Sequence, residues 1–348
     1  MGSEMCIRDR DRSNPDPEKW NMSAPFPFSF DEMTMFSRND IRRPNSNNTR
    51  FAVFTLYNQA KDQLRLKLGY SLQQILLVSN EGGELRNQYL AYANYQDMLN
   101  TYGFGTYRDL LGYVNGSPIM GNWLTSLRNQ READLDGDGV ADVFADENLA
   151  RENMQLFSVG LFERWEDGSL RLDASGNPIP TYTNDDIREL AKIITGQSYG
   201  KNNNSSADDS MNEWGGKPFD QLLDNTDFFS SFDQGDFNDI AYYYPMAMFP
   251  DFHDESETKT IIGGKEITNY DAESVAAATT PEARQALALK DLDDAMDWLA
   301  GKPGDGRPDF DGVNSHGSTP AFVCRRLIQR FVTSNPSQDY LHLSLIHI

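Results

Sequence analysis

The stretch from Asp146 to Gln197 constrains the fold most strongly, because it contains two helical patterns with their own boundary signals. In the first, over residues 147–160, apolar side chains recur every three or four positions across a wide arc, as in a helix buried on most sides. The second, over residues 184–195, begins after the N-cap Thr183 and ends before Gly196, which favours a helix stop. We therefore expect this stretch to form part of a helical core.

The segment between these two helices is predicted to form a small β-hairpin. Asp167-Gly168 and Gly176-Asn177-Pro178 are turn signals. Between them, Leu170 and Leu172 alternate with polar residues, as in a short strand with one apolar face.

Helical periodicity also recurs on both sides of the central stretch. It predicts helices over residues 59–79, 85–101, 118–128, 282–300 and 319–333, with a short one from Tyr107 to Val114. The predicted fold class is therefore mainly α: an irregular multi-helix domain with a small β-hairpin and long loops.

The domain is expected to span residues 13–342, with a surface insertion at about 199–240 where Asn, Ser, Asp and Gly dominate. The two ends do not match their neighbours: Met1–Arg10 and Leu343–Ile348 resemble adapter sequence translated in metagenomic assemblies. We interpret residues 1–12 as a non-native peptide with a disordered lead-in, and 343–348 as a second non-native peptide. On this interpretation the chain is a fragment, its signal peptide is not observable, and both peptides pack against nothing.

The charge balance limits the possible partners. The chain has 53 acidic and 31 basic residues, a net charge of −22 that repels nucleic acid and anionic membranes. No apolar run approaches the length that a membrane span needs. An acidic surface of this kind suits an extracellular, salt-exposed or calcium-bearing protein, although acidic cytosolic proteins also exist.

An aspartate-rich loop before the central stretch carries the strongest motif. Acidic residues stand at positions 1, 3, 5 and 9 of a calcium-loop pattern, and a glycine stands at position 6. Alternate carboxylates can converge on one hard cation, and the glycine permits the sharp turn. The residues expected to hold calcium are Asp134, Asp136, Asp138, Asp142 and, through its carbonyl oxygen, Val140.

The motif departs from an EF-hand at position 12, where Ala145 replaces the bidentate glutamate. Asp146 or Glu147 is a weaker candidate for that ligand. A second and less complete loop covers residues 309–314. The alternative is that residues 134–142 form a solvated acidic turn without an ion.

Three residues are candidates for catalysis. Glu152 lies on the apolar helix 147–160, so we predict that it is buried and paired, as part of a structural network or as a catalytic carboxylate. His253 precedes Asp254 and is a candidate general base, although such a histidine also commonly bonds a backbone carbonyl. Asp185, in the first turn of helix 184–195, is the third candidate.

Several blocks together resemble one bacterial family, catalogued as domain of unknown function 1800. The resemblance covers roughly residues 59 to 339, apart from the insertion. The blocks that carry it include DQLRLKLGYSLQQILLVS (62–79), DENLARENMQLFSVGL (146–161), DASGNPIPTYTNDDIRELAKIITG (173–196), HDESETKTIIG (253–263) and TPAFVCRRLIQRFVTSNPS (319–337).

The resemblance implies a largely helical and usually exported protein, often encoded beside an exported partner of a sulfatase-like family. It brings no established activity and no catalytic residues. Members usually have a histidine near Gly103 and near Ser117, and a tryptophan at Gln197, none of which is present in this chain.

Two functions therefore remain open. The first is an exported, calcium-stabilised protein without catalytic activity that acts in a cell-surface or secretion assembly. The second is a hydrolase of envelope or environmental polysaccharide that uses Glu152, Asp185 or His253. A cleft where Glu152 and His253 meet would favour the hydrolase, and a filled core around them would favour the structural role.

Overall fold

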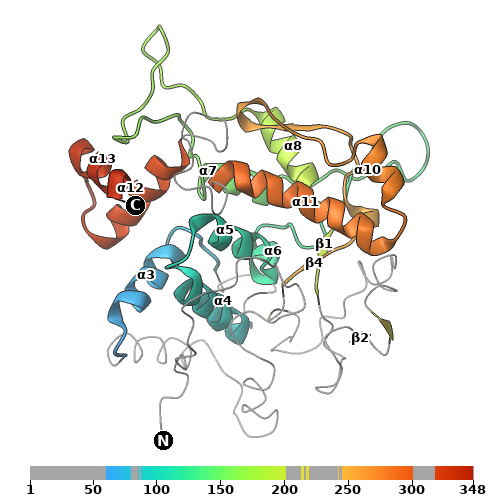
Figure 1. Cartoon of the computed structure of the whole chain (residues 1–348), viewed down its shortest axis with the longest axis horizontal. Coiled ribbons are helices and arrows are strands. Elements are labelled where there is room, and N and C mark those ends of the chain that lie inside the picture. Colours follow the sequence, from blue (N-terminus) through green and yellow to red (C-terminus); the bar gives the residue numbers. More distant parts are fainter. Residues whose placement is uncertain are drawn as a thin grey trace, which may run out of the picture.

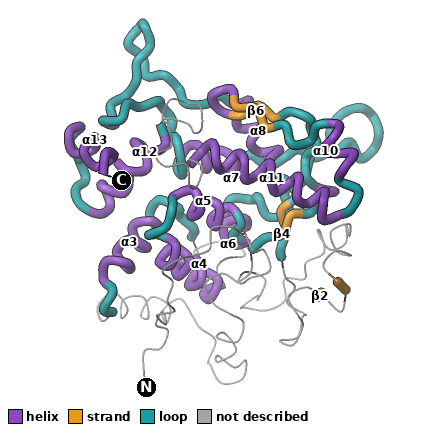
Figure 2. The backbone as a smooth tube through the Cα atoms, in the orientation of Figure 1, coloured by secondary structure: helices purple, strands orange, loops and turns teal. Residues whose placement is uncertain are grey.

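The computed structural model describes residues 60–79, 85, 88–200, 213–214, 217–218, 242, 245–300 and 318–347. Helices dominate this part of the chain and the strands are short, so the fold is mainly α (Figures 1 and 2). The helices are α3 (Gln63–Gln73), α4 (Tyr89–Tyr102), α5 (Tyr107–Asn115), α6 (Pro118–Trp123), α7 (Asn148–Gln155), α8 (Asn184–Ile194), α10 (Ala272–Ala277), α11 (Pro281–Ala300), α12 (Thr319–Phe331) and α13 (Gln338–His347).

The described strands form three antiparallel pairs of two strands each. They join β1 (Gln197–Ser198) to β4 (Ala247–Met248), β2 (Glu213–Trp214) to β3 (Lys217–Pro218), and β5 (Lys259–Ile261) to β6 (Lys265–Ile267). Short 3-10 turns, η4 (Pro250–Phe252) and η5 (Ile262–Gly264), lie before β5 and between β5 and β6. Among the described residues, no helix is both long and apolar enough to cross a membrane.

Helix α8 forms the centre of the core, and its sequence signals are confirmed. Thr183 and Asp186 make the reciprocal capping-box contacts at its N-terminus. Its apolar side chains are fully buried against α7, α11 and β5. They are Ile187, Leu190, Ala191, Ile193 and Ile194.

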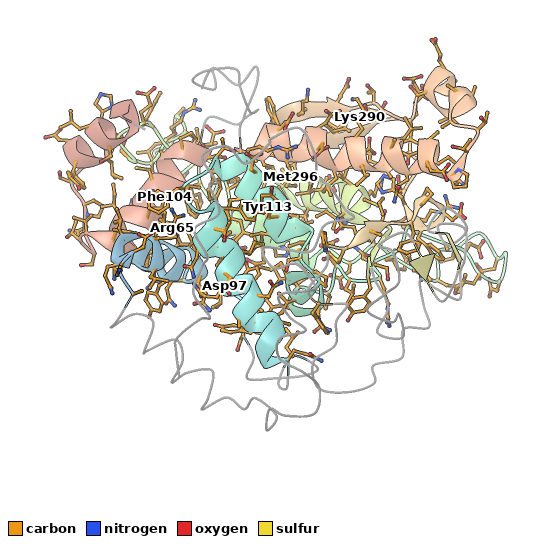
Figure 3. All side chains as sticks on the ribbon, turned by 60° about the horizontal axis from the view of Figure 1, so that its bottom comes forward. Arg65, Asp97, Phe104, Tyr113, Lys290 and Met296 are labelled. Carbon is orange, nitrogen blue, oxygen red and sulfur yellow. The ribbon has the colours of Figure 1, made fainter. Side chains whose placement is uncertain are left out.

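Helix α11 lies across α5 and is fixed to it by both apolar and charged contacts. Met296 is buried toward α5, whereas Lys290 points away from the body (Figure 3). Arg108 of α5 donates to the carboxylates of Asp293 and Asp297, at 2.9 and 2.7 Å. The two carboxylates on one face of α11 thus neutralise a buried guanidinium on α5.

The predicted hairpin is a β-arm, residues 161–181, that projects from the body beside α12 and α13 (Figure 1). Its base pairs Phe162 with Pro180, and two short hairpins branch from that base. The branches are closed by the bridges Arg164 to Leu170 and Leu172 to Pro178. Both predicted turns lie at the hairpin ends, where Gly168 and Gly176 have positive φ angles.

Three predicted helices end earlier than expected, and the first of them, α3, stops at Gln73 rather than 79. Helix α6 stops at Trp123 rather than near residue 128, because Thr125 adopts a left-handed φ of 58°. Helix α7 stops at Gln155 rather than 160, because the chain turns tightly there and Gly160 adopts a φ of 76°. The Ser158 hydroxyl donates to the carbonyl of Asn153 and closes this turn.

Helices α10 and α13 were not predicted. Helix α13 continues through residues 343–347, where Leu343 is exposed, and Leu341, just before that range, is buried. The expected peptide 1–12, most of the insertion 199–240 and the second acidic loop 309–314 lie outside the described residues.

Candidate functional site

The acidic loop brings three of its predicted ligands together. Carboxylate oxygens of Asp134, Asp136 and Asp138 all lie within 4.8 Å of one another, and the three residues are exposed. An antiparallel bridge between Ala133 and Val143 closes the base of the loop. Three of the four predicted aspartates therefore face one point, and Asp142 is not part of that group.

Backbone N–H groups shape this loop around Asp134. The Asp134 carboxylate accepts from the N–H groups of Gly137 at 2.6 Å and Gly139 at 2.8 Å. Both glycines have positive φ angles, 77° and 86°, which an L side chain rarely adopts. The same hydrogen bonds, led by Gly139 and Gly137, hold the pKa of Asp134 below its usual value, so the carboxylate stays charged at neutral pH.

The other predicted ligands make different contacts. Asp142 Oδ2 accepts from the Leu135 N–H at 2.8 Å, and the Val140 N–H donates to Asp138 Oδ1 at 2.8 Å. Asp146 Oδ1 accepts from the Thr125 hydroxyl and from the first N–H of α7. Glu147 pairs with Arg151 at 3.1 Å, as its i,i+4 spacing predicts.

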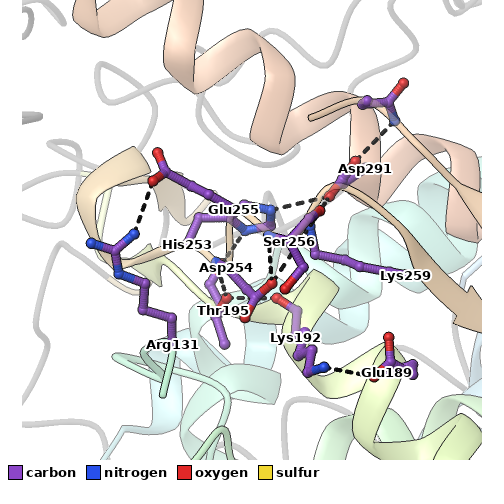
Figure 4. A network of polar contacts seen from close by, with 11 residues as sticks. Arg131, Glu189, Lys192, Thr195, His253, Asp254, Glu255, Ser256, Lys259 and Asp291 are labelled. Carbon is purple, nitrogen blue, oxygen red and sulfur yellow. Dashed lines mark hydrogen bonds and ion pairs between the residues drawn. The ribbon is translucent and has the colours of Figure 1, made fainter. Parts of the chain in front are cut away.

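His253 belongs to a second cluster, a buried network that joins α8, β5 and α11 (Figure 4). Its side chain is 0% exposed, with Nδ1 2.9 Å from the Thr195 carbonyl oxygen and Nε2 3.4 Å from Asp291 Oδ2. A carbonyl oxygen only accepts, so Nδ1 carries a proton and donates it to Thr195. The imidazole also stacks on the Tyr270 ring, with the centroids 5.6 Å apart.

Lys259 supplies the counter-charge within this network. Its ammonium lies 2.7 Å from Asp291 Oδ2 and 3.7 Å from Asp254 Oδ1, and it donates to the Ser256 carbonyl at 3.2 Å. The residue is 0% exposed, and its charge also lies 4.7 Å from the centre of the Tyr270 ring. The lysine is therefore fully removed from water but surrounded by acceptors.

Asp291 has polar contacts on three sides, and Lys259 and Asn269 are hydrogen-bond donors among them. Asn269 donates to its second oxygen at 2.9 Å, in addition to the contacts from Lys259 and His253. Burial alone would raise the pKa of Asp291, but the hydrogen bonds and charges of His253 and Lys259 outweigh it and lower that pKa. This enclosure suits a structural cross-link that holds the segment 253–270 on α8 and α11.

The prediction that Glu152 is buried and paired is wrong. Glu152 is half-buried, and its Oε2 has no hydrogen-bond partner. Burial raises the pKa of this carboxyl, and the nearby charge of Arg151 offsets the effect only in part. The residue lies one turn before the early end of α7, at the edge of the core.

The inward polar position on α7 is instead Asn153. It exchanges two amide hydrogen bonds with Asn115 of α5, at 2.7 and 3.0 Å, and both residues are fully buried. Asp185, the third catalytic candidate, has a side chain that is 86% exposed and pairs with Arg188. Within the described part of the chain, no hydrogen bond or ion pair joins Glu152, Asp185 and His253.

Sequence reasoning missed Lys259 and Asp291. Asp291 is the one acid on the buried face of α11 whose side chain is almost completely enclosed, at 1% exposure. A charged residue inside an apolar helical period is a usable signal, because such a group needs a partner. Its partner Lys259 is 32 positions away in the sequence, so spacing alone did not connect them.

Comparison with known proteins gives one match. The family described as "Protein of unknown function (DUF1800)" matches residues 9–343. No curated protein and no solved structure shows significant similarity to the chain.

Proposed function

The chain belongs to the DUF1800 family, and from that premise we propose that it is an exported helical protein stabilised by calcium in its acidic loop, residues 134–142. The role proposed for it is in a cell-surface or secretion assembly. The observation that carries the calcium part is the convergence of Asp134, Asp136 and Asp138 within 4.8 Å.

The chemistry of the loop supports calcium over other cations. All candidate ligand atoms are oxygens, which calcium prefers, and calcium accepts six to eight of them in flexible geometry. Three exposed carboxylates this close repel one another, and a divalent cation removes that repulsion. The Asp138 and Asp136 carboxylates also accept local N–H groups, which leaves their other oxygens for an ion.

Calcium in this loop would act on the core through the chain that follows it. Asn129 donates to the Asp146 carbonyl and accepts from the Asp146 N–H, at 3.1 and 2.8 Å. Gly196, at the end of α8, donates to the Asn129 carbonyl at 2.8 Å. A tighter loop therefore restrains the start of α7 and, through Asn129, the end of α8.

Isothermal titration with calcium tests the proposal. We expect one site with a Kd between about 0.1 and 1 mM, the range of extracellular calcium modules. Asp136→Ala should abolish the heat. Asp173→Ala is the matched control, because Asp173 also accepts N–H groups in an exposed turn, from Ser175 and Asn177, but has no acidic cluster around it. The absence of binding, or equal binding by Asp136→Ala, would contradict the proposal.

The enclosure of His253 supports the non-catalytic role. Both ring nitrogens are engaged, and the side chain has no exposed surface. The alternative function, hydrolysis of polysaccharides, stays a prediction, and no specific observation favours it.

Export and the sulfatase-like partner are proposed from the family resemblance. Cell fractionation with an antibody against the chain should locate it outside the cytoplasm, and co-precipitation should recover a sulfatase-like protein. Recovery in the cytoplasm alone would contradict the export proposal.

A further inference from the structure

His253 faces a hydrogen-bond acceptor at each of its two ring nitrogens (Figure 4). Nδ1 lies 2.9 Å from the carbonyl oxygen of Thr195, and Nε2 lies 3.4 Å from Asp291 Oδ2. A neutral imidazole has one N–H group and one lone pair, so it can donate to only one of these two oxygens. The imidazolium has two N–H groups and can donate to both.

The carboxyl group of Asp291 does not supply the proton between it and His253. Lys259 donates to Oδ2 of Asp291 at 2.7 Å, and Asn269 donates to Oδ1 at 2.9 Å. Although burial raises the pKa of Asp291, its contacts with His253 and Lys259 outweigh that effect and lower this pKa. Both carboxylate oxygens are therefore acceptors, and a neutral His253 would direct its Nε2 lone pair at one of them.

The charges around His253 lack one positive charge. Two carboxylates, those of Asp291 and Asp254, share the ammonium group of Lys259, at 2.7 and 3.7 Å. Lys192 of α8 also acts on Asp254, but its ammonium group already forms an ion pair at 2.6 Å with an acid of its own helix. An imidazolium at His253 gives the buried network two positive and two negative charges, the balance that burial favours.

The other titratable groups beside His253 do not supply the missing charge. The Tyr270 ring stacks on the imidazole with the centroids 5.6 Å apart, and burial raises the pKa of its phenol, so that group stays neutral. The charged groups at the partly exposed rim of the network pair with one another. They are Arg131, Asp251, Glu255, Arg284, Lys290 and Asp294.

We propose that His253 carries a proton on both ring nitrogens at neutral pH, and that this charge makes the buried network a pH-sensitive latch. The latch consists of His253, Lys259 and Asp291, and it holds the segment 253–270 on α8 and α11. The Nδ1 proton is donated to Thr195 at the end of α8, and the Nε2 proton is donated to Asp291 on α11. Loss of the Nε2 proton removes one of these two bonds and leaves an excess negative charge in a buried site.

The latch weakens as the pH rises. In an unfolded chain histidine titrates near pH 6.5, so it is mostly neutral above about pH 7.5. The folded state keeps the additional proton and binds more protons than the unfolded state, so the free energy of unfolding decreases with increasing pH. The unfolding equilibrium constant then increases by up to about tenfold for each pH unit. This pH dependence is opposite in sign to the one expected for Asp291 at acidic pH.

Long-range ¹H–¹⁵N NMR spectra of the protein labelled with ¹⁵N-histidine test the protonation of the ring. We expect both ring nitrogens of His253 to carry a proton at pH 7, with both N–H signals visible because the side chain has no exposed surface. His253→Gln assigns these signals. If that variant does not fold, substitution of the other three histidines assigns them by elimination. One protonated ring nitrogen instead of two at pH 7 would overturn the proposal.

Urea unfolding between pH 7 and pH 9.5 tests the latch itself. The wild type should lose stability across this range, and His253→Gln should lose clearly less, because glutamine does not titrate. His342→Gln is the matched control, because the His342 side chain is 47% exposed and lies 3.7 Å from Glu166, and this variant should keep the wild-type slope. Equal slopes for the wild type and His253→Gln would show that other groups cause the loss and would remove the latch.

Discussion

The acidic loop and the buried network use the same carboxylate groups under opposite conditions. In the loop, three aspartates lie within 4.8 Å of one another at the surface, and no basic side chain is paired with them among the described residues. In the network, Asp291 is 1% exposed and is bonded by Lys259, His253 and Asn269. The network contains its own cation, Lys259, whereas we propose that the loop takes one from solution.

The difference in exposure and in partners determines how each region contributes to stability. A buried charge that loses its partner has no water to replace it, so the network is sensitive to every member. An exposed carboxylate is solvated and screened, so the loop without an ion contributes little. The comparison predicts large effects in the network and ion-dependent effects in the loop.

Removal of Asp291 should have the largest effect. Asp291→Ala leaves Lys259 buried without its carboxylate, and we expect a loss of about 3–5 kcal/mol in the free energy of unfolding. Asp185→Ala is the control, because that carboxylate is 86% exposed and pairs with Arg188 at the surface, and its loss should cost less than about 1 kcal/mol. Urea unfolding measures both, and similar losses would remove the contrast between buried and exposed carboxylates.

Acidic pH should reduce the contribution of the buried network to the free energy of unfolding. The folded pKa of Asp291 is lowered, so its stabilisation is present above the unfolded value of about pH 4 and is lost as pH falls through the folded pKa. The pKa of Asp254 is also lowered, because Ser256 and Lys259 outweigh its burial, and it acts with the same sign. Unfolding curves from pH 7 to pH 2.5 should show this loss, and Asp291→Asn should reduce the slope. An unchanged slope would mean that other carboxylates cause it.

Glu152 is intermediate between the carboxylates of the two regions in its environment, because it is half-buried and one of its oxygens has no partner. Its pKa is raised, so the folded state disfavours the charged form above that pKa. Glu152→Gln should therefore raise stability at pH 7 by about 0.5 kcal/mol and leave it unchanged at acidic pH. A loss of stability at pH 7 would show that the carboxylate makes a contact that the amide cannot.

The smallest effect is expected in the loop without an ion. Asp138→Asn relieves repulsion among three exposed carboxylates and should change the melting temperature by about 1 °C or less in chelator. A differential scanning measurement at low salt checks this. A large decrease would show that the Asp138 charge stabilises the loop by itself.

Local signals predicted the parts of the fold that depend on neighbouring residues. The capping box of α8, the two turns of the β-arm and the Glu147 to Arg151 pair all lie within four positions in the sequence. The helix ends near Thr125 and Gly160 were missed, because tertiary packing imposes those left-handed angles. Gly160, for example, lies directly against the Phe322 ring of α12.

The candidate sites also divide into one that local spacing predicted and others that depend on contacts between distant segments. Asp134, Asp136 and Asp138 follow one another in a single loop, so their spacing predicted their convergence. Lys259 and Asp291 join segments that are far apart in the sequence, and no spacing rule reaches them. Glu152 was predicted to be the polar residue of α7 that points into the core. In the structure, Asn153 occupies that position and bonds Asn115 of α5.

Thermal unfolding with calcium and with chelator tests the central claim most directly. At a hundredfold excess over Kd, calcium should stabilise the wild type by about 2.7 kcal/mol and raise its melting temperature by several degrees. Asp136→Ala should show no shift, and Asp291→Ala should melt lower but keep the calcium shift, because Asp291 is not among the carboxylates of the loop. Equal melting temperatures of the wild type with calcium and with chelator would contradict the claim that the loop is a calcium site.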